Sequence, residues 1–258
     1  MKKDILVIIP HSSRKRPREI KKEWLSNNQR FLLYSGSSET DRYSELLYDF
    51  RNILDNQQIL FPISQIYVNI CRHPERLDEI CPLEIRGKKI YNQEISAELR
   101  KQLIKRYTVP FYKKIEQFKG NIILNGHTTT LDHLGLKRKL SHQIVISNIQ
   151  KRGNGVKRFA PDKLIEIYVK ELRKRLPRIK IGINSVYVDI YDHFCDRFGW
   201  KKNGEGIPII HQETDESLYI KDNKLDRREL NKLRTAIAEA LFETSKRYQQ
   251  RYKLNKIN

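Results

Sequence analysis

The sequence predicts an α/β protein in which helices cover both faces of one mostly parallel or mixed sheet. Short apolar runs, such as those at residues 5–9 and 122–124, have the length and composition of buried strands. Amphipathic stretches alternate with these runs along the chain, which is typical of a sheet with helices on both sides. We find no repeat and no low-complexity linker, so we expect one domain over residues 1–258.

The individual elements follow from apolar spacing and from proline. We expect strands at residues 5–10, 66–70, 121–125, 144–147, 179–183 and 207–212. Apolar positions three or four apart predict helices at 41–56 and 226–248, and a proline suited to a first turn begins another at 161–174. Residues 94–118 favour two helices, because Pro110 interrupts the pattern and has no backbone N–H to donate.

The formal net charge of +20 favours contact with an anionic partner. Nucleic-acid or other polyanion binding, on a vestigial enzyme fold, is therefore one alternative function. However, Lys and Arg are spread along nearly every predicted helix, the densest patches at 14–16 and 170–178 are short, and no zinc-finger spacing or aromatic RNA-binding signature accompanies them. We favour a solvated cationic surface, whose field would also attract a small dicarboxylate.

The remaining composition narrows the class further. The three cysteines, Cys71, Cys81 and Cys195, contain no CxxC and predict neither a disulfide framework nor a thiolate zinc site. No stretch approaches the roughly 20 apolar residues that a membrane span needs, and the first apolar run is too short for a signal peptide. We expect a cytoplasmic protein without a membrane partner. The pattern makes no prediction of oligomeric state.

Three polar residues lie where predicted strands end. His11 and His127 each follow an apolar strand directly, and Glu213 ends a third. Ligands of open α/β sheets bind outside the carboxyl ends of the strands. Each residue alone is better explained as an ordinary loop residue, but together they suggest a metal site with two imidazoles and a base.

Several short motifs carry a more specific resemblance, in one order over roughly residues 5 to 220. They are P-H-S-S at 10–13 with Pro17, T-D-R-Y at 40–43, V-N-I-C-R-H-P at 68–74, P-F-Y at 110–112, I-L-N-G-H-T at 123–128, and H-Q-E at 211–213 with L-Y at 218–219. Together they resemble the N-formylglutamate amidohydrolase family. The resemblance implies a three-layer α/β/α fold of the zinc-exopeptidase (phosphorylase/hydrolase-like) kind. It also implies a metal-dependent amidohydrolase that removes an N-formyl or other small N-acyl group from an amino acid.

The resemblance assigns the metal ligands and the base residue by residue. His11 and His127 would hold a divalent metal, with zinc the expected ion. Asp41 is our choice of third ligand and Glu39 the fallback, although an Asp at that position also suits a helix cap. Glu213 would take a proton from a water molecule whose pKa the metal lowers from 15.7 to about 7, and would pass it to the departing amine.

The substrate would be held by side chains around these groups. Arg72 is the expected anchor for a substrate carboxylate, because its planar fork donates two parallel hydrogen bonds. The alternative is a surface arginine paired with Glu75 or Asp78. Asn69 and Tyr219 are further candidates for substrate binding. Tyr219, His211 and Asn125 are also candidates to support the ligands, whereas His73, His133, His142 and His193 are expected in loops or at the surface.

Several positions depart from the family pattern. Cys71, Tyr112 and Asn125 stand where the pattern has Asn, His and Asp, and Asp189-Ile190 replaces two glycines. The hydrolytic centre therefore transfers better than the specificity pocket. A carboxypeptidase or deacylase of different acyl specificity, or an inactive relative, stays an alternative.

Overall fold

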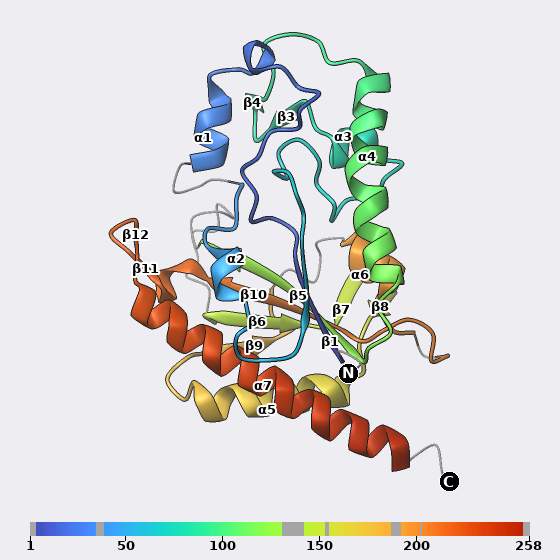
Figure 1. Ribbon diagram of the computed structural model, residues 1–258, viewed down its shortest axis with the longest axis vertical. Helices are drawn as coiled ribbons and strands as arrows, with labels where there is room; N and C mark the ends of the chain where they lie inside the picture. The colour runs from blue at the N-terminus through green and yellow to red at the C-terminus, as the bar shows by residue number, and fades with distance from the viewer. Residues whose placement is uncertain are drawn as a thin grey trace.

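The computed structural model describes residues 4–34, 39–130, 142–152, 155–186, 192–201 and 203–254. A sheet lies at its centre (Figure 1). This sheet has six strands in the order β2-β1-β5-β10-β6-β9. All neighbouring strands are parallel except β10 and β6. The strands are β1 (Ile5–Ile9), β2 (Gln57–Leu60), β5 (Ile122–Thr129), β6 (Ile144–Ser147), β9 (Ile181–Ile183) and β10 (Ile209–Asp215).

The two faces of the sheet are buried against different helices. Alternate side chains of β1, including Ile5 and Val7, belong to a core shared with α5 (Asp162–Arg175) and α7 (Arg227–Leu254). Leu6 and Ile8 belong to the opposite core, which includes Phe111 and Ile115 of α4 (Ala97–Glu116). Because successive strand side chains point to opposite faces, an all-apolar strand needs cover on both sides. The predicted three-layer α/β/α fold is confirmed.

Five of the six expected strands are present, and one is wrong. Residues 66–70 do not form a strand, because Tyr67 and Val68 both donate their amides to Ser64 and turn the chain. The apolar side chains of this segment are instead buried in the α4-side core. Strand β2 was not expected, because this edge strand has the mixed sequence Gln-Gln-Ile-Leu and lacks an apolar run.

The helices also differ from expectation in two places. Helix α4 continues through Pro110, which lies on the exposed side beside exposed Val109, where helix carbonyls can turn to water. The helix expected over 41–56 shortens to α2 (Ser44–Leu47). The helices expected at 161–174 and 226–248 are confirmed as α5 and α7.

The rest of the described fold consists of shorter helices and two-stranded ribbons. The other helices are α1 (Asn28–Tyr34), α3 (Leu77–Ile80), α6 (His193–Phe198) and two 3-10 turns, Lys22–Trp24 and Glu216–Leu218. Three two-stranded ribbons pair β3 (Glu84–Ile85) with β4 (Lys88–Lys89), β7 (Ile149–Arg152) with β8 (Gly155–Arg158), and β11 (Ile220–Lys221) with β12 (Lys224–Leu225). Among the helices described, none is long and apolar enough to cross a bilayer.

Candidate metal centre

The three neighbouring strands β1, β5 and β10 end at one edge of the sheet and bring the predicted residues together. The parallel register of β5 and β10 pairs Glu213 with His127, and His211 with Asn125. Paired residues of neighbouring strands point to the same face. His11 follows β1 on the other side of β5, so His127 lies between the other two contributions.

A glycine permits this arrangement on β5. A Cβ added to Gly126 would lie only 2.8 Å from the ring of Tyr48, so the aromatic ring packs directly on the bare backbone. The Tyr48 hydroxyl donates to the backbone carbonyl of His127 at 2.7 Å and lies 2.9 Å from Thr214 Oγ1. Tyr48 thereby fixes the backbone that carries His127.

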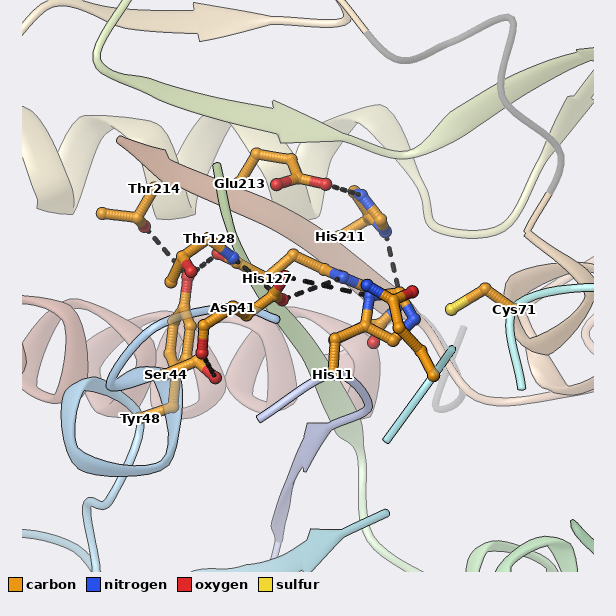
Figure 2. Close-up of polar contacts among 12 residues, drawn as sticks. His11, Asp41, Ser44, Tyr48, Cys71, His127, Thr128, His211, Glu213 and Thr214 are labelled. Carbon is orange, nitrogen blue, oxygen red and sulfur yellow. Dashed lines mark hydrogen bonds and ion pairs between the residues drawn. The ribbon is translucent and has the colours of Figure 1, made fainter. Parts of the chain in front are cut away.

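His11, Asp41 and His127 form a compact group of potential ligands. Figure 2 shows the Asp41 and His11 side chains close to the His127 ring. Asp41 lies 3.9 Å from Nδ1 of His11 and 3.5 Å from Nδ1 of His127 through its two carboxylate oxygens. The two imidazole rings meet edge to face, 4.8 Å apart between centroids. One donor atom from each residue lies within 4.8 Å of the others.

The structure distinguishes the two explanations of Asp41. The N-cap of α2 is Tyr43, in the left-handed region at φ 60°, and its side chain makes no capping hydrogen bond. The Asp41 carboxylate instead accepts a 3.1 Å hydrogen bond from the backbone N–H of Thr128, which orients it toward the two histidines. Glu39, the fallback ligand, pairs with Arg86 at 3.1 Å.

The protonation states of the two histidines suit the binding of a cation. Burial lowers the pKa of His127 to about 4, and burial together with the neighbouring His127 holds the pKa of His11 well below its usual range. Both rings are therefore neutral near pH 7, which is the form that binds metals. Burial raises the pKa of Asp41. The Nε2 atoms of both histidines are buried without a hydrogen-bond partner, so these residues fit a divalent metal.

Glu213 lies beside His127 on β10, and its carboxylate is 3.4 Å from Nε2 of His211. Nδ1 of His211 lies 3.6 Å from a carboxylate oxygen of Asp192, a residue that was not among the expected site residues. Burial opposes charge on His211, but Asp192 and Glu213 outweigh it and raise its pKa to about 9. Asp192 is itself buried, yet its contacts with His211 lower its pKa to about 2.

The predicted substrate-binding residues fall into two groups. The charge of Arg72 influences the pKa of His11, Glu39 and Cys71, which places it beside the centre. Asp78, one of its two alternative partners, bonds Arg100 at 2.6 Å. Asn69 forms a side-chain hydrogen bond with His11 that only partly offsets the lowering of the His11 pKa by burial.

Tyr219 occupies a different position. Its side chain is fully buried, and its hydroxyl donates to the backbone carbonyl of Arg42 at 2.9 Å. Because Arg42 follows Asp41, this contact fits the second of the two expected roles, support of the ligand-bearing loop. The other expected role, contact with substrate, stays a prediction.

Four histidines were expected in loops or at the surface. The three of them that the structure describes belong to none of the residue groups with metal-ligand spacing. The surface expectation was wrong for His193, which is buried in α6 with its ring 4.7 Å from that of His73. His142 lies in a loop, and His133 lies outside the described residues. Tyr112, at a departure from the family pattern, is buried and donates to the carbonyl of Ile70 at 3.3 Å. The replaced glycine pair at 189–190 also lies outside the described residues.

Comparison with known proteins supports the fold. The chain is similar to the crystal structure of an N-formylglutamate amidohydrolase from Ralstonia eutropha JMP134, with a TM-score of 0.65 and 17% identity over 92% of this chain and 93% of that one. It is also similar to a gene product of Agrobacterium tumefaciens, with a TM-score of 0.66 and 16% identity over 98% of this chain and 92% of that one. No protein-family model and no curated protein matches the sequence. At these identities the likeness establishes a shared fold.

Proposed function

We propose that the chain is a metal-dependent amidohydrolase that removes a formyl or other small acyl group from the nitrogen of an amino acid. The observation that carries the proposal is the meeting of His11, Asp41 and His127 at the sheet edge, with Glu213 on the adjacent strand. The fold shared with an N-formylglutamate amidohydrolase supports the same class of reaction.

His11, Asp41 and His127 would hold a divalent cation, with zinc the expected ion because two imidazoles and one carboxylate leave an open position for substrate or water. Such an ion lowers the pKa of a bound water molecule to about 7 and polarises a carbonyl oxygen. Thr128 and Tyr48 keep the ligands in place through Asp41 and the His127 backbone.

Glu213 would act as general base and then as general acid. Its carboxylate removes a proton from the attacking water and delivers it to the amine that leaves, so the carboxylate is regenerated in each cycle. A positioned acid or base of this kind contributes about 10²–10⁴-fold to the rate. His211, 3.4 Å from one Glu213 oxygen, restrains the carboxylate in that task.

Arg72 would bind the carboxylate of the amino-acid substrate. Its guanidinium presents parallel N–H donors that match a carboxylate. The net charge of +20 would aid the approach of an anionic substrate. Two of the five cations in the basic segment 170–178 are already paired, since Lys174 and Arg175 both bind Glu171. This pairing supports a small acid over a polyanion as the partner.

The experiment is a panel of N-formyl, N-acetyl and peptide-like derivatives of several amino acids, assayed on purified protein together with elemental analysis. We expect about one equivalent of divalent metal, hydrolysis that a chelator abolishes, and loss of both in His127→Ala. The matched control, His142→Ala, keeps both. Full metal occupancy in His127→Ala would contradict the ligand assignment, and hydrolysis of the peptide-like derivatives alone would favour a carboxypeptidase.

A further inference from the structure

Asp192 is a buried carboxylate that the proposed reaction does not use directly. It caps helix α6, where one of its oxygens accepts from the backbone amides of Phe194 at 2.9 Å and Cys195 at 3.4 Å. Its other oxygen faces the end of the sheet. There it accepts a 2.9 Å hydrogen bond from Asn125 Nδ2 and lies 3.6 Å from His211 Nδ1.

These contacts favour a role as hydrogen-bond acceptor over a second metal site. Asp192 belongs to two groups with metal-ligand spacing, one with Cys71 and His127 and one with Cys195 and His211. However, both of its oxygens already accept bonds from protein donors. A buried carboxylate whose lone pairs are occupied in this way orients its donors.

Asp192 can orient Glu213 through His211, whose ring lies between the two carboxylates. Nδ1 of His211 lies 3.2 Å from Asn125 Nδ2 as well as 3.6 Å from Asp192, and Nε2 lies 3.4 Å from a Glu213 oxygen. If Nδ1 accepts from Asn125, the Nε2 proton points at Glu213. If Nδ1 donates to Asp192, the ring is the doubly protonated imidazolium, so Nε2 still carries a proton toward Glu213. Both hydrogen-bond patterns therefore present an N–H to that carboxylate.

We propose that Asp192 is a positioning residue that holds Asn125 and His211 so that the His211 Nε2–H fixes the carboxylate of Glu213. The inference rests on the proposed function for the role of Glu213, but the hydrogen-bond network is a separate claim. Asp192 is the N-cap of α6. The backbone of this helix is tied to Cys71 by a 2.9 Å hydrogen bond from His193 N to Cys71 O.

Asp192→Asn tests the proposal, because asparagine caps a helix about as well as aspartate. The new amide places a donor opposite Asn125 Nδ2, where the wild type has an acceptor at 2.9 Å. We expect kcat to fall about 10–100-fold, with KM within about twofold and the metal content unchanged. The matched control is Asp226→Asn, since Asp226 accepts from Arg228 N and Glu229 N at the start of α7. We expect that control to have wild-type kcat.

The exchange variant Asn125→Asp with Asp192→Asn separates positioning from a general effect on folding. It restores one donor and one acceptor across the same contact, with their direction reversed, so we expect it to recover at least tenfold of the lost kcat. Asn125→Asp alone places two carboxylates in that contact, and we expect it to be as impaired as Asp192→Asn. A double variant no better than either single variant would overturn the proposal.

Histidine ring NMR gives a readout that needs no activity. In protein with ¹⁵N-labelled histidine, we expect a slowly exchanging Nε2–H signal of His211, identified by its loss in His211→Gln. The signal should be lost in Asp192→Asn and recovered in the exchange variant. An unchanged signal in Asp192→Asn overturns the positioning role, even if the wild type hydrolyses no derivative. A wild type without hydrolysis, but with this pattern, refutes only the proposed reaction.

Discussion

Substitution of Gly126 by alanine probes the packing that supports His127. The added methyl would lie 2.8–2.9 Å from three atoms of the Tyr48 ring, distances that real contacts essentially never show. Tyr48 is fully buried, and its hydroxyl is held by the His127 carbonyl and by Thr214. The ring cannot move aside without weakening these two hydrogen bonds.

The magnitude follows from these contacts. Overpacking of a core costs about 1–3 kcal/mol, and the loss of one hydrogen bond adds about 1 kcal/mol. We expect Gly126→Ala to lower the free energy of unfolding by about 2–4 kcal/mol. For a chain of this size that corresponds to a fall in Tm of roughly 5–15 °C.

Thermal and urea unfolding of Gly126→Ala, measured in the wild-type and Tyr48→Leu backgrounds, would check this account. The smaller leucine removes the ring that the methyl would strike, so Gly126→Ala should cost at least 1 kcal/mol less there, a coupling typical of contacting residues. Equal costs in the two backgrounds, or a Tm within 1 °C of the wild type, would refute the reasoning.

Three further predictions concern the charged groups. Glu213→Gln should lower kcat about 10²–10⁴-fold with metal content retained; kinetics near wild type would exclude it as the base. Arg72→Lys should raise KM about tenfold or more for substrates with a free carboxylate, because a fork becomes a point charge, and the matching carboxamides should show no such change. Arg42→Met should destabilise the fold by about 3–5 kcal/mol in urea unfolding, because buried Glu216 loses its 2.6 Å ion pair with Arg42 Nε and keeps only neutral donors, the backbone N–H of residue 42 and the Thr128 hydroxyl. A loss below 1 kcal/mol would show that Glu216 finds another partner or is protonated.

The central strands were predictable because their continuous apolar sequence matches the burial of both faces of the sheet in the folded protein. Residues 5–9 and 122–124 are apolar at every position, and both faces of the sheet are covered in the structure. The run at 66–70 has a similar composition, but packing into the core stabilises it as a turn. Composition alone does not separate these two outcomes.

The candidate centre was predictable only in part. His11, His127 and Glu213 were found because each follows or ends an apolar run in the sequence. In the structure β5 and β10 continue past His127 and Glu213, to Thr129 and Asp215. The sequence left Asp41 balanced between ligand and helix cap, and the tertiary contact with Thr128 decides its orientation. Asp192 carried a recognisable local signal as a helix cap, but its bond to Asn125 spans 67 residues, and no local pattern connects the two.

X-ray diffraction from crystals grown with zinc, with data collected above and below the zinc absorption edge, tests the central claim most directly. We predict one strong anomalous peak within about 2.0–2.2 Å of donor atoms from His11, Asp41 and His127. The absence of a peak there, or a fully occupied peak among Asp192, Cys195 and His211 in its place, would contradict the account.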